Sequence, residues 1–377
     1  MAIVRNRTKQ ATVDYKLTAV VLILLGVGLV ILYSASTVLS FSKFGNNTHY
    51  FFNQLTQGVL LGLLCMYVCS KINYHRWQKL APLLVFLSIV LLALVLVPGI
   101  GFKVGNARRW LDIGPLFFQP AEIAKLALIF YIASWIDKRR DEINDFYYGI
   151  IPTLVITGAV AGLIILQPDL GTMLVVTVTA FVMLFVGGSK IKHLLWIFVI
   201  GLVALGILIK LEPYRLQRLT TFLNPGIDPQ GTGYQINQAM VAIGSGGFFG
   251  RGYTESRQKY NYLPEVMGDS IFAVTVEELG FLRSGLIIGL FLVLAFRGLR
   301  IANHAPDTFG KMLAVGIISW ISFQALINIG AIIGVLPLTG IPLPFVSFGS
   351  SALVVLLSAV GILLNISKHS SLSYARN

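Results

Sequence analysis

Ten apolar runs alternate with polar connections along this chain, and each run is long enough to cross a bilayer. The runs cover approximately residues 17–37, 51–70, 81–98, 119–136, 149–166, 170–187, 194–210, 271–296, 312–334 and 349–366. A helix needs about 20 predominantly apolar residues to span the hydrocarbon core. The pattern therefore predicts an all-α, polytopic membrane protein with about ten transmembrane helices.

The connection between the seventh and eighth runs, from about residue 212 to 270, is much longer than the others. Loops of this length in compact proteins are usually functional or disordered. Aromatic residues along this connection argue against disorder, among them Tyr214, Phe222, Tyr234, Phe248, Phe249, Tyr260 and Tyr262. We therefore expect short amphipathic helices over the outer face of the bundle, within a single membrane domain of residues 1–377.

Composition and charge agree with a membrane protein and predict its orientation. Charged residues make up 12% of the chain, against roughly 25% in soluble domains. The net charge of +13 is spread over short connections rather than gathered on one face, which excludes a nucleic-acid-binding surface. With the N terminus inside, 17 of the 29 Lys and Arg residues fall in inner segments, nine in outer segments and three within runs. Because cytoplasmic segments carry the excess of positive charge, both termini are predicted to be cytoplasmic and the long loop to face outside.

The outer side offers only a few kinds of chemistry. Of the five histidines, only His49 lies in a predicted outer segment, and both cysteines lie within one run. A histidine-based triad or a His-rich zinc site is therefore excluded there. Any reaction at this face must use a carboxylate as general base, with Arg and Lys side chains as clamps for anions.

Acidic residues concentrate in the stretch KYNYLPEVMGDSIFAVTVEELG, residues 259–280. It holds four of the 16 Asp and Glu residues, namely Glu265, Asp269, Glu277 and Glu278. Glu277 and Glu278 are expected at the start of a span, where the helix dipole also favours acids. Arg215 is one of the cations that the same long loop supplies.

The segment QPAEIAK, residues 119–125, places Glu122 and Lys125 three residues apart at the start of a predicted helix. Residues at this spacing lie on one face of a helix and can pair as they enter the hydrocarbon. One interpretation is a purely structural ion pair. The other is the wall of an outer cavity, in which the lysine neutralises the phosphate of a substrate.

Two further segments carry candidate polar groups at the outer boundary. In NARRWLDIG, Arg108 and Arg109 flank Trp110; they could contact a phosphate or a sugar, or could be interfacial anchors. In QPDLGT, Asp169 could line the cavity or could cap the following helix. The proline-rich segment LPLTGIPLPFVSFGSS, residues 336–351, is expected to shape the same cavity, because non-helical backbone at membrane depth must be buried in protein or line a cavity.

Taken together and in this order, several of these segments resemble the SEDS family (shape, elongation, division, sporulation) of bacterial cell-wall polymerases. The matching pieces are NARRWLDIGPLFFQPAEIAKL, QPDLGTMLV, RLTTFLNPGIDPQGTGYQINQAMVAIGSGGFFGRGY, YLPEVMGDSIFAVTVEELGF and NIGAIIGVLPLTGIPLPFVSFGSSAL. Within the family, SRQKYNYLPE is more similar to the division (FtsW-like) form than to the elongation (RodA-like) form.

The resemblance implies a peptidoglycan glycosyltransferase in the bacterial cytoplasmic membrane that polymerises lipid II on the outer face. It implies Asp269 as the catalytic residue, four residues after the LPE. Its partners would be a class B penicillin-binding transpeptidase and other division or elongation membrane proteins. Substrate contacts are expected from Arg108, Arg109, Glu122, Lys125, Asp169, Arg215 and Glu265. A divalent cation could help to neutralise the pyrophosphate.

A lipid-precursor flippase or transporter is the rival function, because it also suits ten spans with polar residues at membrane depth. Transporters place ionisable groups near the midplane on broken helices, often with repeat symmetry between the two halves of the chain. In this chain the charges concentrate at the predicted outer mouth, and the two halves show no symmetry.

Overall fold

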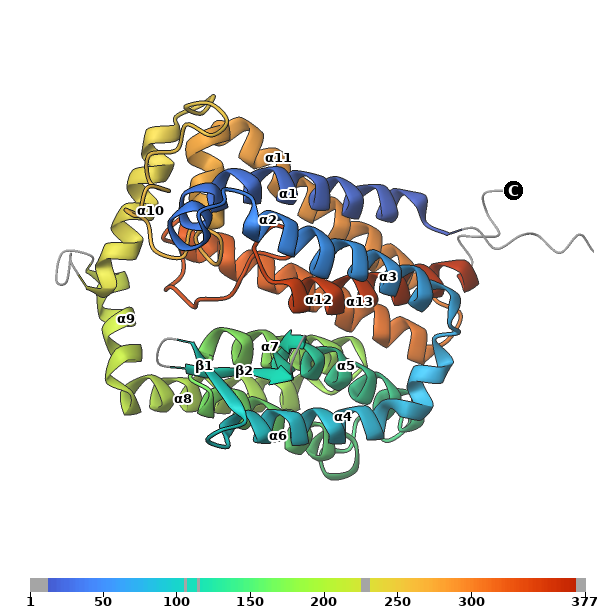
Figure 1. Ribbon diagram of the computed structural model, residues 1–377. Helices are drawn as coiled ribbons and strands as arrows, with labels where there is room; N and C mark the ends of the chain where they lie inside the picture. Colours follow the sequence, from blue (N-terminus) through green and yellow to red (C-terminus); the bar gives the residue numbers. More distant parts are fainter. Residues whose placement is uncertain (1–12, 105–106, 114–115, 225–230, 371–377) are drawn as a thin grey trace, which may run out of the picture.

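The computed structural model describes residues 13–104, 107–113, 116–224 and 231–370, and it forms a bundle of long helices (Figure 1). The long helical stretches are α1 (Tyr15–Phe44), α2–η1–α3 (His49–Asn53, Gln54–Leu60, Leu61–Lys71), α4 (His75–Leu96), α5 (Pro120–Lys138), η2–α6 (Phe146–Ile150, Ile151–Leu166), α7 (Leu170–Val186), α8 (Ile191–Leu211), α11 (Ile271–Asn303), α12 (Thr308–Ile332) and α13 (Ser350–His369). Every predicted apolar run corresponds to one of them.

Within the described ranges, eight of these stretches are long and apolar enough to cross a membrane. The other two are α7, which is apolar but has 17 residues, and α5, which carries Glu122, Lys125 and Asp137 in its 19 residues. The predicted polytopic, helical membrane fold is therefore confirmed.

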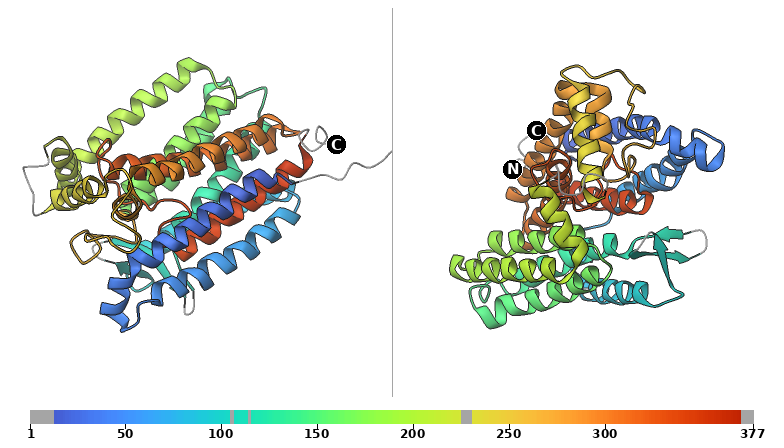
Figure 2. Two further views of the ribbon diagram at one scale, coloured as in Figure 1. Left: turned by 90° about the horizontal axis from the view of Figure 1, so that it is seen from above. Right: turned by 90° about the vertical axis from the view of Figure 1, so that its left-hand side faces the viewer.

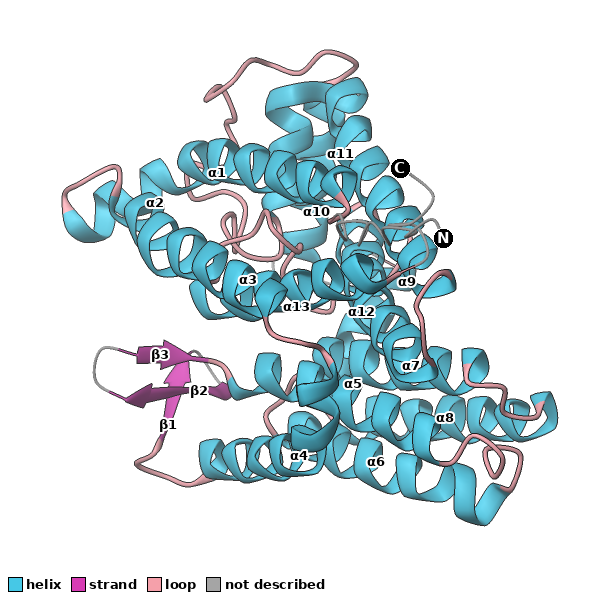
Figure 3. Cartoon of the chain, turned by 90° about the vertical axis from the view of Figure 1, so that its right-hand side faces the viewer, coloured by secondary structure: helices cyan, strands magenta, loops and turns pink. Residues whose placement is uncertain are grey.

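The helices form two groups joined by α12. Helices α4 to α8 lie together on one side, and α1, α3, α11 and α13 lie on the other (Figures 1 and 3). Helix α12 packs against α5 and α7 of the first group and against α11 of the second. Its central position explains why Trp320, its largest side chain, is only 1% exposed.

The long loop folds as the sequence predicted, into short helices at one end of the bundle. These are α9 (Pro213–Leu223) and α10 (Thr232–Gly246), which lie at the end opposite to the start of α1 (Figure 1). The end of α13 lies at the same end as the start of α1. The two ends of the bundle therefore differ in kind, since one carries short turns and the other carries α9, α10 and the segments around Asp269.

Helix α11 is broken at Gly280, which the sequence did not predict. Gly280 has φ 82° and ψ 173°, and the freed backbone groups bond to the glycine-rich segment 247–252. Arg251 N donates to Glu277 O at 2.9 Å, and Phe281 N donates to Gly247 O at 2.9 Å. A side chain at Gly280 would collide with backbone atoms of that segment.

Glu277 and Glu278 lie in the first part of a spanning helix, as predicted. The break separates this mostly buried part from the more exposed part of α11, which begins at Phe281. The glycine-rich stretch from residue 242 to 253 comprises the end of α10 and the segment that docks on the break.

A small antiparallel sheet fills the connection between α4 and α5, and it was also missed by the sequence reasoning. Its strands are β1 (Gly101–Val104), β2 (Ala107–Ile113) and β3 (Leu116–Phe118), in the order β1-β2-β3. The sheet stands at the edge of the bundle (Figure 3). Trp110 and Phe117 stack with ring centroids 4.8 Å apart, so the sheet has a small aromatic cluster of its own.

Helix α8 is the most loosely held of the long helices. Only 6% of its apolar stretch is buried in the protein, against 78% for α12. It lies at the edge of the bundle, and its packing partners are α7 and α9 (Figure 2).

The two ends of the bundle can be assigned to the two sides of the membrane by labelling. In protein with Cys65 and Cys69 replaced by alanine, a cysteine at the exposed position Glu255 is expected to react in intact cells with a membrane-impermeant maleimide. A cysteine at the exposed position Arg140, at the opposite end, is expected to react only after the membrane is opened. The reverse pattern would contradict the predicted orientation.

Candidate active site

Asp269 lies in the short segment that enters α11, and neighbouring elements hold this segment at three points. Ser347 Oγ donates to Gly268 O at 2.7 Å, and Phe348 N donates to Met267 O at 2.8 Å. Asn328 Nδ2, from α12, donates to the carbonyl oxygen of Asp269 at 2.8 Å. The position of the carboxyl group is therefore fixed by α12 and by the segment that follows it.

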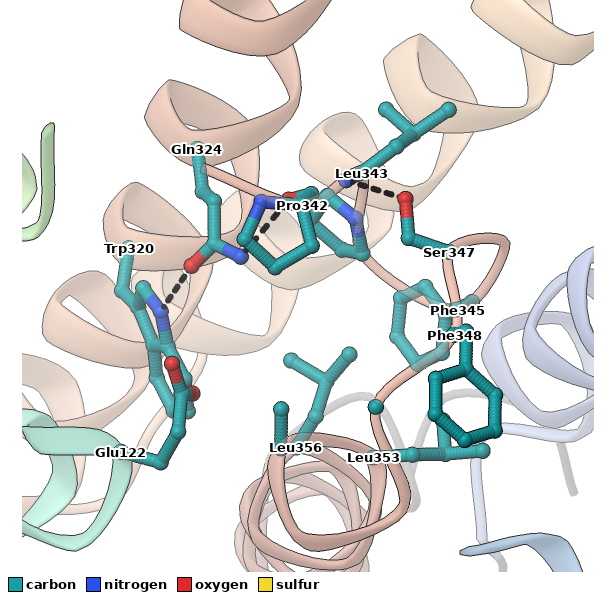
Figure 4. Close-up of a pocket in the computed structure, with 13 residues that line it drawn as sticks. Glu122, Trp320, Gln324, Pro342, Leu343, Phe345, Ser347, Phe348, Leu353 and Leu356 are labelled. Carbon is teal, nitrogen blue, oxygen red and sulfur yellow. Dashed lines mark hydrogen bonds between the residues drawn. The ribbon is translucent and has the colours of Figure 1, made fainter. Parts of the chain in front are cut away.

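The segment that follows α12, residues 333–349, has no regular secondary structure because its prolines cannot continue a helix. Side chains supply the hydrogen bonds that a helix would have made. Gln324 Nε2 donates to Pro342 O at 3.0 Å, and Ser347 Oγ accepts from Leu343 N at 2.8 Å (Figure 4). The buried Gln54 accepts from Gly349 N at 3.1 Å. The expectation that this segment is buried in protein and shapes a cavity is met.

The Asp269 side chain is half-buried and accepts a hydrogen bond from Gln235 Nε2 of α10 at 3.2 Å. Burial raises the pKa of this carboxyl group from 3.8 to about 6, and the negative charge of Glu265 acts in the same direction. The hydrogen bond from Gln235 and the positive charge of Arg218 oppose this rise in the pKa. A carboxyl group with a pKa near 6 is ionised at neutral pH and is a stronger base than an ordinary aspartate.

Arg218 of α9 and Asp269 both approach the same side of Gly340. A Cβ atom built on Gly340 would lie 3.8 Å from Asp269 Oδ2 and 3.9 Å from Arg218 Nη1. Gly340 also has φ +75°, which side chains rarely tolerate. Arg218 Nη1 donates to Leu338 O at 3.3 Å, which anchors it to the same segment. The sequence reasoning did not select Arg218, although its spacing of three from Arg215 places both on one face of α9.

Two cavities meet at Arg218. One, of about 260 Å³, is lined by Arg218, Gly231, Gln235, Ile236, Pro264 and Leu338. The other, of about 90 Å³, lies between α7, α8 and α9 and is mostly apolar, with Leu170, Leu174, Leu205 and Ile209 among its lining residues. Arg218 and Leu338 line both. The charged Arg218 therefore stands between the larger cavity, which Gln235 also lines, and the smaller apolar cavity among the helices.

Arg215, which the sequence reasoning placed in the substrate site, is engaged differently. It is buried, and its guanidinium donates to Tyr214 Oη at 2.9 Å, to Leu208 O at 3.0 Å and to Ile165 O at 3.4 Å. These carbonyls lie near the ends of α8 and α6, where helices leave acceptors unpaired. Arg215 lines the apolar cavity, but its donors hold helix ends together.

The predicted pair of Glu122 and Lys125 is present on α5. Lys125 Nζ lies 2.9 Å from Glu122 Oε1 and 2.9 Å from Gln324 Oε1, and it stands 4.8 Å from the centre of the Trp320 ring. Both charged side chains are at most 4% exposed. Glu122 lines a water-sized cavity of about 20 Å³ with Trp320 and the 342–349 segment (Figure 4). The pair is thus joined through Gln324 to the segment that holds Asp269.

The remaining predicted site residues lie on or near the sheet. Asp169 caps α7 by accepting from Thr172 N at 2.9 Å. Arg109 lies 3.8 Å from Asp169 and donates to Gln167 O at 3.0 Å and to Pro168 O. Arg108, the next residue along β2, points to the other face of the strand, opposite Lys103. Arg109 and Asp169 therefore fasten the sheet to the corner between α6 and α7.

The four acids of residues 259–280 divide into two kinds. Glu278 is buried and pairs with Lys259 at 3.0 Å, and Ser34 of α1 donates to it at 2.6 Å. Glu277 accepts from Ser256 Oγ at 2.5 Å and from Arg257 N at 3.0 Å. These two acids hold the long loop on the bundle. Glu265 is exposed with φ +51°, and its carbonyl oxygen closes the turn that carries Asp269.

The described residues hold no group of three or more His, Cys, Asp or Glu side chains arranged to bind a metal ion. Asp269 and Glu265 are the acids of the turn that precedes α11, and two carboxylates alone do not make up a preformed site. That a divalent cation could help to neutralise the pyrophosphate stays a prediction.

Comparison with known proteins supplies the family. The profile of the FTSW_RODA_SPOVE family, described as cell cycle protein, matches residues 15–372. The chain belongs to the SEDS family. It is 43% identical to stage V sporulation protein E of Bacillus subtilis, over 96% of this chain and 99% of that protein. It is 41% identical to the probable peptidoglycan glycosyltransferase FtsW of Trichlorobacter lovleyi, over 97% of this chain and 96% of the relative.

Solved structures of SEDS proteins share the fold. A chain of a peptidoglycan synthase complex, described as coordinating polymerization and crosslinking, is 30% identical with a TM-score of 0.76, covering 94% of this chain and 98% of that one. The rod shape determining protein RodA of Thermus thermophilus is 29% identical with a TM-score of 0.71, covering 94% of this chain and 97% of that one. This SEDS chain is thus a multi-pass membrane protein of the RodA-like fold.

The buried pair on α5 is expected to contribute strongly to stability. Replacing Lys125 by methionine leaves the Glu122 carboxylate buried without its cation, which should lower the free energy of unfolding by about 3–5 kcal/mol. Replacing Glu122 by glutamine in the same protein should recover part of the loss. The measurement is unfolding of the purified protein in mixed detergent and SDS micelles.

The control lies at the other end of the same helix. Arg139 and Glu142 also form an ion pair at a spacing of three, but both are more than 40% exposed. Replacing Arg139 by alanine should cost less than about 1 kcal/mol. Equal losses for the two variants would contradict a stabilising role for the buried pair.

Proposed function

We propose that this chain is a peptidoglycan glycosyltransferase that polymerises lipid II, with Asp269 as general base. The 4-hydroxyl of the acceptor sugar attacks the anomeric carbon of the donor, and its proton passes to the Asp269 carboxylate. The bond from that carbon to the lipid pyrophosphate breaks as the new glycosidic bond forms. Both relatives named above at 41–43% identity cover nearly the whole chain, and one of them is named for this activity.

One observation carries the assignment of the site. Arg218 and Asp269 both lie next to Gly340, and Arg218 lines two cavities, a larger one beside Gln235, the hydrogen-bond partner of Asp269, and a smaller, mostly apolar one. Lipid II has the same sequence of parts, since a polar disaccharide is joined through a pyrophosphate to an isoprenoid chain. The larger cavity beside Gln235 would take the sugars, Arg218 the pyrophosphate and the smaller apolar cavity the first part of the lipid. Positive charge at the leaving group stabilises the transition state.

The proposal extends to the setting of the enzyme. Lipid II is used on the outer face of the bacterial cytoplasmic membrane, so the end that carries α9, α10 and Asp269 faces outside and both termini face the cytoplasm. A class B penicillin-binding transpeptidase is the proposed partner, which is supported by the similarity to a chain of a synthase complex. We assign the chain to the division branch on its SRQKYNYLPE segment, and depletion of the protein in cells tests that branch against sporulation and elongation.

Replacing Asp269 by asparagine is expected to lower the rate of lipid II polymerisation by about 10²–10⁴-fold, because asparagine cannot accept the proton. In the unaltered protein, the rate should fall as the pH drops below about 6, because the carboxylate becomes protonated there. The measurement is glycan-chain formation from purified lipid II by the protein with its transpeptidase partner.

Glu265→Gln is the matched control for Asp269→Asn. It removes a neighbouring acid from the same turn, and its expected effect on the rate is small because Glu265 shapes the turn through its backbone. Folded Asp269→Asn protein that polymerises lipid II near the normal rate would exclude Asp269 as the base. Movement of intact lipid II across the membrane without polymer would favour a flippase instead.

The two arginines of α9 should respond differently to replacement by glutamine. Arg218→Gln removes the charge at the junction of the cavities, so it should reduce polymerisation strongly while the protein stays folded. Arg215→Gln breaks bonds to helix ends, so it should lower the melting temperature first. Normal activity of Arg218→Gln would exclude Arg218 as the pyrophosphate ligand.

A further inference from the structure

Helix α12 presents three polar side chains in one line on its buried face. Trp320, Gln324 and Asn328 are each four residues apart, so they lie one above another along the helix. Trp320 Nε1 donates to Gln324 Oε1 at 2.8 Å, and Gln324 Nε2 donates to Pro342 O (Figure 4). Gln324 accepts a hydrogen bond from the Lys125 ammonium group, and Asn328 donates one to the backbone carbonyl of Asp269. The three side chains therefore connect the buried ion pair of α5 with the turn that carries Asp269.

Asn328 is the end of this line and touches both sides of the site. It is 2% exposed, and its Nδ2 donates to Asp269 O and to Ile341 O, each at 2.8 Å. Ile341 directly follows Gly340, the residue that Asp269 and Arg218 both approach. One amide group therefore fixes the residue carrying the proposed base and the segment carrying the wall opposite to it.

The side-chain carbonyl oxygen of Asn328 indicates that the two hydrogen bonds donated by Nδ2 are the reason for an asparagine at this position. Asn328 Oδ1 is buried and has no hydrogen-bond partner in the part of the chain that the structure describes. A buried carbonyl oxygen without a donor is unfavourable, and an apolar side chain in this apolar helix would avoid it. The two N–H bonds of Nδ2 are what an apolar residue could not provide.

We propose that Asn328 is a positioning residue. It sets the distance between the Asp269 carboxylate and the 338–341 wall of the cavity, and thereby the position of the base relative to the leaving group. The inference rests on the proposed function, because it assumes that Asp269 is the base. Asn328 does not reach the substrate itself. It acts because α12 is the most buried of the spanning helices, whereas the turn that carries Asp269 is irregular and includes Glu265 with φ +51°.

Loss of this tether has a defined kinetic signature. In Asn328→Ala, kcat for lipid II polymerisation should fall by about 10- to 100-fold, since a misplacement of about 1 Å can cost 10²-fold. KM should change little, because Arg218 and both cavities remain. The Asp269 carboxyl group should become more accessible to water, so its pKa should decrease from about 6. The acid limb of the pH profile, where kcat falls as this carboxylate is protonated, should therefore move to lower pH.

Asn365 of α13 is the matched control. It is 3% exposed and also bridges two backbone groups, donating to Ser70 O at 2.9 Å and accepting from Tyr74 N at 3.0 Å, at the opposite end of the bundle. Asn365→Ala should lower the melting temperature like Asn328→Ala but leave kcat and the acid limb unchanged in the folded fraction. If the two variants have the same kinetics, Asn328 is only structural and the proposal is wrong.

Ser347→Ala keeps the proposal testable if Asn328→Ala fails to fold. It removes the bond to Gly268 O, which holds the same turn from the other side, and it should shift the acid limb in the same direction. An unchanged limb in the folded Ser347→Ala protein would count against positioning. Inactive Asp269→Asn with normal Asn328→Ala kinetics overturns this inference alone, whereas active Asp269→Asn overturns the base assignment and the inference with it.

Discussion

Backbone N–H and C=O groups at membrane depth must find partners inside the protein, because hydrocarbon offers none. Among the residues that the structure describes, the segment 333–349 and the break in α11 at Gly280 leave the helical pattern and must meet this requirement. In the first, side chains of Gln324, Asn328 and Ser347 supply the bonds. In the second, the backbone of residues 247–252 supplies them. The turn with Asp269 precedes α11 and is held by the first of these segments, through Ser347 and Phe348.

Buried charged side chains must likewise find partners inside the protein. The ammonium groups of Lys125 and Lys259 each meet a carboxylate and additional oxygen acceptors, as buried ions require. Glu277 meets hydroxyl and backbone donors instead of a cation. Asp269 differs because its carboxylate receives a hydrogen bond from Gln235 and lies near Arg218, but forms no ion pair with it in the described part of the chain. A carboxylate left in this state keeps basicity that a tight ion pair would remove.

The positions of the spanning helices were predictable because a run of about 20 apolar residues has few alternatives to a membrane helix. The pair Glu122–Lys125 and the Asp169 cap were also predictable, since both depend on spacings of three residues within one segment. The role of Arg218 was not, because its importance comes from Gly340, which is distant in the sequence. The strands β1 to β3 have three to seven residues, too few for a period to stand out.

The break in α11 and the bridge by Asn328 show the remaining limit. A glycine in an apolar run is common in membrane helices, so Gly280 alone does not announce a break. Only the distant glycine-rich segment that docks on it makes the break favourable. Asn328 and Gln324 did leave a signal, since two amides four residues apart in an otherwise apolar helix have to bond to something. What they bond to is set by the tertiary structure.

The exposure of α8 has a consequence for the dependence of this enzyme on its lipid surroundings. Because only 6% of its apolar stretch is buried, lipid chains rather than neighbouring helices decide how far it tilts. A bilayer thinner or thicker than the apolar length of a helix is met by changes in tilt. Leu205 and Ile209 of α8 line the apolar cavity at Arg218, so a change in tilt alters the width of that cavity. The thickness of the bilayer therefore affects the width of the cavity beside Arg218, while the more buried helices that position Asp269 stay in place.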